Sequence, residues 1–186
     1  MRRLTVLRHA KSSWDAPALD DFDRPLNDRG WKSARQMGRE LKARGLRFDC
    51  VLASTAVRVR ETLEGIGQEY DLGAPIRFEQ AIYLAATQTL VSLVRDLPED
   101  VQAPLLVGHN PGLERLLVKL THDDDEGLRD RIAGKYPTGA LAVVEFPAAK
   151  WSDITLGSGE IVELILPSEL DSGSSNRRSR AETCRG

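Results

Sequence analysis

Two of the three histidines in this chain, His9 and His109, each stand just after a short apolar run. The runs cover residues 4–7 and 105–107, and a short apolar run that ends in polar residues and a turn predicts a buried strand. Open α/β sheets bind their ligands outside the carboxyl ends of the strands. We therefore expect both histidines at that sheet edge, where Arg8 adds a positive charge and points to an anionic ligand, most simply a phosphate.

Strand-like and helix-like segments alternate along most of the chain. Strands are expected at residues 3–8, 50–53, 76–78, 104–107, 141–146 and 161–166. Helices are expected at residues 27–44, between Ser54 and Tyr70, at residues 87–96 and from residue 111 onward. The alternation predicts an α/β fold in three layers, α/β/α, whose mainly parallel sheet carries helices on both faces. The last two strands, with Gly157 and Gly159 between them, predict an antiparallel hairpin at one edge of the sheet.

Polar residues at the starts of these segments predict three helix caps. Asn27 is expected to cap the first helix, and Gly45 stands just beyond its end. Thr87 is the candidate cap of a later helix. Asn110 is expected to cap the last of the predicted helices, with Pro111 in its first turn, where the missing N–H of proline costs nothing.

Composition and charge are those of an ordinary globular domain. A chain of 186 residues is long enough for one domain, which we place at residues 1–170. Residues 171–186 are almost entirely polar and are expected to form a disordered tail. A net charge of −2 and an aromatic content of 5% disfavour nucleic acid as a partner. A monomer is the default expectation.

Membrane insertion and secretion are not expected either. No apolar stretch approaches the roughly 20 residues that span a bilayer. The apolar run after Met1 is too short for a signal peptide. The two cysteines, Cys50 and Cys184, cannot form a disulfide framework, so a reducing, cytoplasmic location is the default expectation.

Four side chains at three predicted strand ends can surround one phosphate. Transfer of a phosphoryl group needs an in-line nucleophile and cationic donors around the oxygens. His9 is the candidate nucleophile, Arg8 is the cation beside it, and His109 follows another strand. Arg58 begins the helix after the second strand, where backbone N–H groups also favour an anion, and Arg60 is its rival. This set needs neither a metal nor another cofactor.

The candidate residues lie in segments that resemble known motifs. Residues 7–10 are Leu-Arg-His-Ala, residues 54–62 begin Ser-Thr-Ala-Val-Arg, and residues 107–111 contain the second histidine. They resemble, in order, the Arg-His-Gly signature, the Ser-Pro-x-x-Arg-Ala-x-Gln-Thr segment and the second-histidine segment of the histidine phosphatase (phosphoglycerate-mutase-like) superfamily. Residues 21–27 resemble the Asp-x-x-Arg-Pro-Leu stretch of its small SixA branch, the phosphohistidine phosphatases. With residues 136–140, the similarity extends to about residue 166.

The resemblance implies a metal-independent mechanism. His9 would attack phosphorus and form a phosphohistidine intermediate, which water would hydrolyse. The phosphate oxygens would be held by Arg8, Arg58 and His109, and the pocket would be bordered by Asp21 and Arg24. Nearby arginines that lower the pKa of His9 would help to keep it neutral. Judged from the residues alone, Asp21 and Arg24 could also form an ordinary surface ion pair.

Three residues depart from the family pattern. Ala10 stands where glycine is usual, and its methyl group could narrow the floor of the pocket. Thr55 replaces proline, and Glu61 replaces glutamine and adds a negative charge near the site. Larger members of the family also carry an inserted carboxylic acid that protonates the leaving group, whereas this chain offers only Glu79 as a weak candidate.

The missing acid favours a leaving group that needs little protonation. Phosphohistidine releases imidazole, whose conjugate acid has a pKa of about 6.5, whereas phosphate esters release an alkoxide. The sequence thus predicts a phosphatase that removes phosphate from phosphohistidine in a protein, as in signal transduction through a phosphorelay. Two alternatives stay open: a phosphomonoesterase for a small phosphorylated metabolite, and a non-catalytic phosphate-binding module.

Overall fold

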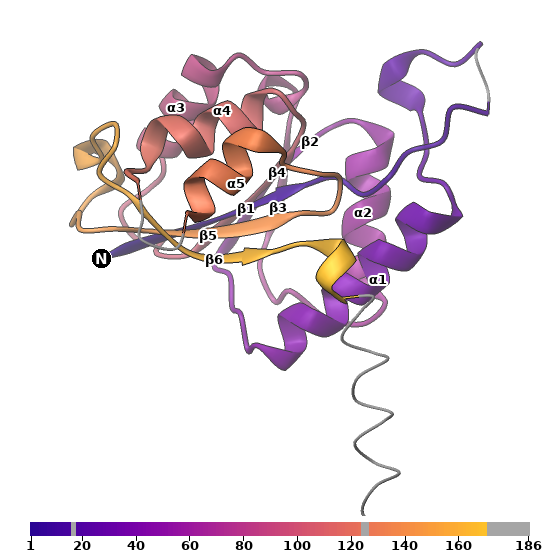
Figure 1. Ribbon diagram of the computed structural model, residues 1–186, viewed down its shortest axis with the longest axis horizontal. Helices are drawn as coiled ribbons and strands as arrows, with labels where there is room; N and C mark the ends of the chain where they lie inside the picture. The colour runs from indigo at the N-terminus through magenta and orange to yellow at the C-terminus, as the bar shows by residue number, and fades with distance from the viewer. Residues whose placement is uncertain (16–17, 124–126, 171–186) are drawn as a thin grey trace, which may run out of the picture.

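The structure is a computed structural model that describes residues 1–15, 18–123 and 127–170 (Figure 1). The strands are β1 (Arg2–Arg8), β2 (Cys50–Ser54), β3 (Ile76–Glu79), β4 (Pro104–Gly108), β5 (Leu141–Phe146) and β6 (Glu160–Ile165). The helices are α1 (Asp28–Ala43), α2 (Val57–Gly67), α3 (Thr87–Arg95), α4 (Gly112–Leu120) and α5 (Leu128–Gly134), with short 3-10 turns at Asp21–Asp23, Gln80–Ile82 and Trp151–Asp153. The predicted polar tail, residues 171–186, lies outside the described residues, and its disorder stays a prediction.

The strands of the described chain form one sheet in the order β3-β2-β4-β1-β5-β6. The pairs β3–β2, β2–β4 and β4–β1 are parallel, whereas β5 is antiparallel to both β1 and β6. The predicted mainly parallel sheet with an antiparallel hairpin at one edge is therefore confirmed. In the connection from β5 to β6, Gly157 has a φ of +72°, a left-handed conformation that glycine adopts without strain.

Helices cover both faces of this sheet, which confirms the predicted three layers. Figure 1 shows α1 and α2 on one face and α3, α4 and α5 on the other. Residues of β1 alternate between the two faces, as the pleat of a strand requires. Val6 packs in the apolar cluster that includes Leu116 of α4, and Leu7 packs in the cluster that includes Leu41 of α1 and Ile66 of α2.

The first helix begins and ends as its sequence predicts. Asn27 is the N-cap of α1, and its side-chain oxygen accepts a hydrogen bond from the backbone N–H of Gly30 at 2.9 Å. Gly45 follows the helix with a φ of +64°. The following helix, α2, is shorter than predicted: it ends at Gly67, and the hydroxyl of Tyr70 donates to the carbonyl of Leu46 at 2.7 Å.

The other two predicted caps are wrong. Ala86 occupies the N-cap position of α3, so Thr87 is already inside the helix and its side chain caps nothing. Pro111 occupies the N-cap position of α4. Asn110 does not cap it: its buried Oδ1 accepts no hydrogen bond within the described chain, while its side-chain N–H₂ donates to a carboxylate of α4 at 3.1 Å and to the carbonyl of Tyr136 at 2.9 Å. Asn110 thereby ties the start of α4 to the loop before β5.

One helix, α5, was not predicted. It buries Leu128 and Ile132, four residues apart, which is too short an apolar pattern to identify a helix from sequence. None of the helices in the described ranges is long and apolar enough to cross a bilayer.

Candidate active site

The register of the sheet brings the two histidines together. Arg8 pairs with Gly108 in the parallel ladder between β1 and β4. The next residues, His9 and His109, therefore leave the sheet side by side at its carboxyl edge. Their ring centroids are 5.1 Å apart, and the ring planes are inclined by 53°.

A cavity of about 460 Å³ lies at this edge, within the usual size of small-ligand sites. It is lined by all six residues predicted for the site: Arg8, His9, Asp21, Arg24, Arg58 and His109. Two lysines, Lys11 and Lys135, also line it, so the described lining carries five cationic side chains and one carboxylate. This excess of positive charge suits an anion with more than one negative charge. Within the described ranges, no cluster of three or more His, Cys, Asp or Glu side chains is arranged to hold a metal ion.

His9 is held neutral, with its proton on the nitrogen that faces the backbone. The residue is buried, and Nδ1 lies 2.7 Å from the carbonyl oxygen of Ala10. A carbonyl can only accept, so Nδ1 carries the proton and Nε2 carries the lone pair. Burial lowers the pKa of His9 to about 3; the bond to Ala10 opposes this shift, and the charges of Arg58 and Arg8 add to it. The ring is therefore neutral at physiological pH, as nucleophilic attack requires.

His109 is oriented by the hydroxyl group of Ser54 at the end of β2. Ser54 Oγ accepts a hydrogen bond from the backbone N–H of Ala56 at 3.3 Å and lies 2.7 Å from Nε2 of His109. The hydroxyl proton of Ser54 has no other acceptor in the described part of the chain, so Ser54 donates it to Nε2, and the ring proton of His109 lies on Nδ1. Nδ1 is buried and has no partner among the described residues, so it is a donor available to an anion. Burial is the main cause that lowers the pKa of His109 to about 3, and the neighbouring His9 lowers it further.

Arg8 presents an unpaired donor in the same place. Its Nη1 donates to the carbonyl of Tyr136 at 2.8 Å, whereas its buried Nε has no partner within the described chain. A buried donor without an acceptor costs about 1–3 kcal/mol, and an anion in the cavity would satisfy it. Burial lowers the pKa of Arg8, and Glu114 opposes this shift. The guanidinium nevertheless stays cationic, as arginine does throughout the accessible pH range.

Arg58, and not Arg60, lines the cavity. The Arg58 guanidinium donates to the backbone oxygen of Asp21 and, at 2.9 Å, to its carboxylate Oδ2, and only 3% of the residue is exposed. Arg60 instead donates to the carbonyl of Thr55 at 3.1 Å, and its guanidinium carbon lies 3.9 Å from the ring centroid of Phe78. The two bonds to Asp21 therefore fix the orientation of the Arg58 guanidinium. Of the two arginines of α2, only Arg58 is placed to contact an anion in this cavity.

Asp21 and Arg24 form part of the cavity wall rather than an isolated surface ion pair. Arg24 Nη1 donates to Asp21 Oδ1 at 2.8 Å, its Nε donates to the carbonyl of Ser13 at 3.1 Å, and its Nη2 donates to the hydroxyl of Ser12. The guanidinium carbon lies 3.4 Å from the ring centroid of Trp14. These hydrogen bonds fix the guanidinium plane and, with it, the indole that stacks on it.

Tyr83 connects three of these groups, and sequence reasoning missed it. Its hydroxyl donates to Asp21 Oδ2 at 2.8 Å, and its ring meets the His109 ring edge-on, at 5.4 Å and 87°. The Arg58 guanidinium carbon lies 5.9 Å from the Tyr83 ring centroid. The next residue, Leu84, has a φ of +46°, which is rare outside glycine and marks a strained turn beside the site. The position of Tyr83 shortly after β3, at the same sheet edge, is the one sequence signal that could have indicated it.

Two departures from the family pattern have structural explanations. The side chain of Ala10 packs with Leu26 and Ala34 and does not line the cavity, so the expectation that its methyl group narrows the pocket floor is wrong. Its backbone N–H donates to Thr62 Oγ1 at 3.0 Å. The carboxylate of Glu61 accepts the backbone N–H of Leu26 at 2.6 Å, so this negative charge serves to hold the loop before α1.

The remaining departure is Thr55, and the weak candidate for the missing acid is Glu79. The hydroxyl of Thr55 lies 2.5 Å from the side-chain oxygen of Gln80 and joins the end of β2 to the turn after β3. Glu79 accepts a hydrogen bond from Arg77 at 2.9 Å and is not part of the cavity lining. Glu79 is therefore not placed to protonate a leaving group in the cavity.

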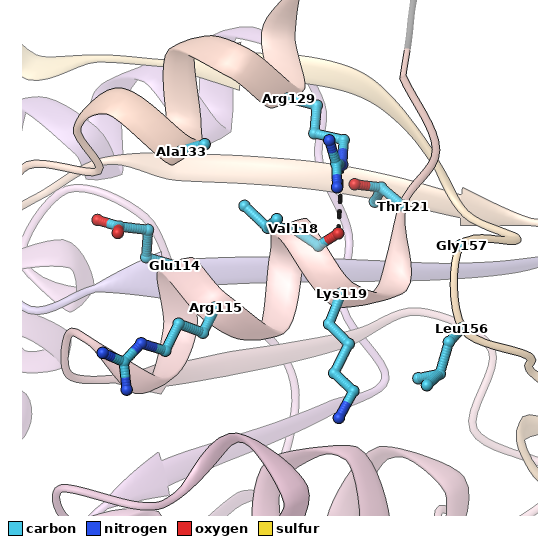
Figure 2. A pocket seen from close by; sticks show the side chains of 9 residues that line it. All are labelled: Glu114, Arg115, Val118, Lys119, Thr121, Arg129, Ala133, Leu156 and Gly157. Carbon is cyan, nitrogen blue, oxygen red and sulfur yellow. Dashed lines mark hydrogen bonds between the residues drawn. The ribbon is translucent and has the colours of Figure 1, made fainter.

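A second and larger cavity, of about 680 Å³, lies beside α4 (Figure 2). It is lined by Glu114, Arg115, Val118, Lys119, Thr121, Arg129, Ala133, Leu156 and Gly157. Figure 2 shows Arg129 of α5 reaching across to the carbonyl of Val118, to which it donates at 3.2 Å. The hydroxyl of Thr121 is already bonded to the carbonyl of Leu117 at 2.8 Å. The described lining holds no histidine or cysteine, whereas His9 and His109 both line the smaller cavity at the sheet edge.

Comparison with known proteins assigns the family. Residues 4–82 match the model of the histidine phosphatase superfamily, branch 1. A candidate SixA phosphohistidine phosphatase of known structure, from Agrobacterium tumefaciens, is 31% identical; the match covers 89% of this chain and 98% of that one, with a TM-score of 0.75. The chain belongs to the histidine phosphatase superfamily.

Two further relatives extend this assignment. A second candidate SixA structure, from Nakamurella multipartitia, has a TM-score of 0.77 and 26% identity, and the match covers 89% of this chain and 96% of that one. An uncharacterized protein of Mycobacterium tuberculosis is 34% identical over 163 residues, which span 87% of this chain and 99% of that protein. These findings confirm the predicted SixA-type branch and make this superfamily member a histidine-dependent phosphatase.

Proposed function

We propose that this protein is a metal-independent phosphatase in which His9 is the nucleophile and a phosphohistidine of another protein is the substrate. One arrangement carries the proposal: the neutral ring of His9, bonded through Nδ1 to Ala10 at 2.7 Å, lies beside unpaired donors on Arg8 and His109. These donors and Arg58 can bind the phosphoryl oxygens, where negative charge is concentrated in the transition state. The arginines can match that charge without a further cation.

The reaction proceeds in two displacements at phosphorus. First, the Nε2 lone pair of His9 forms a bond to phosphorus while the bond from phosphorus to the substrate nitrogen breaks, and the bonding pair stays on that nitrogen. When the other nitrogen of the substrate ring carries a proton, the released imidazole is neutral. Water then attacks the phosphoryl group, the bond to Nε2 breaks with its pair returning to Nε2, and a proton passes to solvent. The Nδ1–H of His9 stays bonded to Ala10 throughout.

Asp21, the one carboxylate of the described lining, is not placed to act as an acid, which supports a leaving group that needs no protonation. Burial alone would raise the pKa of Asp21, but the hydrogen bonds from Tyr83 and Arg58 outweigh it and hold the pKa below its ordinary value. Asp21 is therefore ionised at neutral pH and has no proton to donate. Imidazole leaves far more readily than an alkoxide under these conditions. The Agrobacterium tumefaciens and Nakamurella multipartitia relatives are both named as candidate phosphohistidine phosphatases, which supports the same substrate class.

The test compares a phosphohistidine-bearing phosphotransfer protein with p-nitrophenyl phosphate and a panel of sugar phosphates, all with EDTA present. We expect rapid, EDTA-resistant loss of phosphohistidine, and no turnover by His9→Ala. Arg58→Ala and Arg60→Ala form a matched pair, because each removes one guanidinium from the same helix and only Arg58 lines the cavity. We expect kcat/KM to fall by about 10²–10³ in Arg58→Ala, as when one transition-state donor is removed, and to change little in Arg60→Ala.

Other outcomes would assign another function. Turnover confined to small esters would indicate a phosphomonoesterase for a small phosphorylated metabolite, which the size of the cavity can accommodate. Phosphate binding with no turnover of any substrate would indicate a phosphate-binding module. Activity of His9→Ala equal to that of the wild type would overturn His9 as the nucleophile.

A further inference from the structure

The leaving group lies on the exposed side of the cavity. His9, at 6% exposure, belongs to the buried part of the lining. In-line displacement places the leaving group on the side of phosphorus opposite to the attacking nitrogen. A leaving group displaced by His9 is therefore directed toward the exposed lining residues, which we call the mouth: Lys11, Trp14, Asp21, Leu84 and Lys135.

Trp14 is the one aromatic side chain in the described mouth, and its orientation is set by a neighbour. It is 76% exposed although the guanidinium carbon of Arg24 lies 3.4 Å from its ring centroid. The cation covers one face, so the other face of the indole is open. Arg24 is held in turn by Ser12, Ser13 and Asp21, which keep the stacked pair in place beside the phosphate cavity. The structure thus provides an exposed aromatic side chain, held by Arg24, in the mouth toward which the leaving group is directed.

We propose that Trp14 is a specificity-determining residue whose open face stacks on the planar ring of the leaving group, the imidazole of phosphohistidine. This inference rests on the proposed function, because it concerns the group that His9 displaces. Two aromatic rings in offset or edge-on contact attract each other beyond the effect of buried area alone. A leaving group without a ring, such as an amine or an alkoxide, presents no π-face and gains nothing from the indole. Trp14 therefore selects for a ring-bearing leaving group at the step in which the first bond to phosphorus breaks.

The test uses two small substrates with a P–N bond: N-phosphoimidazole, which releases a ring, and phosphoramidate, which releases ammonia. kcat/KM is measured for each with the wild type, Trp14→Ala, Trp14→Leu and Trp14→Phe, after urea unfolding has shown that each variant is folded. A Trp14 variant that displaces Arg24 changes how the phosphoryl group of both substrates is bound. This effect is common to the two substrates, so it cancels in the ratio of their kcat/KM values. We expect this ratio to fall about 2- to 10-fold in Trp14→Ala and Trp14→Leu, and to stay within about twofold of the wild type in Trp14→Phe.

Each outcome separates the inference from the proposed function. An unchanged ratio in Trp14→Ala, with both substrates turned over, would overturn the role of Trp14 and leave the phosphatase mechanism standing. A ratio preserved by Trp14→Leu as well as by Trp14→Phe would show that apolar contact suffices, and would overturn stacking. Failure of the wild type to turn over the phosphohistidine-bearing protein as well as both small P–N substrates would refute the proposed function and this inference with it.

Discussion

Acidification from pH 7 to pH 5 should destabilise this protein through His9 and His109. Burial gives each residue a pKa of about 3, well below the ordinary value, which is about 6.5 and applies to the unfolded chain. As the pH falls below 6.5, the unfolded chain binds a proton at each imidazole while the folded protein does not. The stability that depends on neutral histidines is therefore fully present above pH 6.5 and is lost progressively between pH 6.5 and pH 3.

The magnitude follows from the two pKa values of each ring. For one such histidine, the free energy of unfolding falls by about 2 kcal/mol between pH 7 and pH 5. His9 and His109 titrate separately in the unfolded chain, so together they contribute about 4 kcal/mol. This is a large part of the total for a typical domain, which is about 5–15 kcal/mol.

Urea unfolding at pH 7, 6 and 5, in buffers without phosphate, measures the effect against a matched control. The control is the double variant His9→Asn with His109→Gln, whose amides can keep the contacts to Ala10 and Ser54 but do not titrate. We expect the wild type to lose about 4 kcal/mol more than the variant, with similar m values, because all other groups are common to both proteins. Equal losses in the two proteins would refute the reasoning that the folded histidines are neutral.

Three further changes test individual contacts. Tyr83→Phe removes the hydroxyl that donates to Asp21, and kcat/KM for phosphoramidate should fall about 2- to 10-fold with little change in the urea midpoint; unchanged kinetics would exclude a positioning role. Thr62→Val leaves the buried N–H of Ala10 without an acceptor and should lower the free energy of unfolding by about 1–3 kcal/mol, which a urea titration checks against Thr62→Ser. Arg2→Leu removes a buried guanidinium that donates to three backbone carbonyls, and it should lower the free energy of unfolding by about 2–4 kcal/mol in a urea titration. Its kcat should stay close to the wild-type value because Arg2 does not line the active-site cavity. An unaltered urea midpoint would contradict the stabilising role of these three hydrogen bonds.

Sequence reasoning located the two histidines because their positions depend on simple rules. Each apolar run is long enough for one buried strand, and parallel strands end at the same edge of a sheet. Once residues 4–7 and 105–107 are strands of one sheet, His9 and His109 have to lie at that edge. The pairing of Arg8 with Gly108 then makes them neighbours. The α/β architecture follows in the same way, from the alternation of strand and helix patterns alone.

Local rules failed at three positions where the fold, and not the neighbouring sequence, decides where a helix starts or which way a side chain packs. Asn110 has the sequence position of a helix cap, but its amide donates to the carbonyl of Tyr136, 26 residues away. Thr87 lies one residue inside the helix that it was expected to cap. Ala10, expected at the pocket floor, packs into the apolar cluster beneath it because the loop after β1 turns its side chain toward α1.

The sequence by itself determined which groups gather at the sheet edge: two histidines, of which His9 is the candidate nucleophile, and the arginines at or just after the strand ends. Only the tertiary structure decided their protonation and orientation. The bond of Ser54 to His109 and the bond of Tyr83 to Asp21 join residues that are 55 and 62 positions apart. The low pKa values of His9 and His109 arise mainly from burial, which exists only when α1–α5 cover the sheet. Such properties depend on the distances between remote segments, which no local pattern of residues specifies.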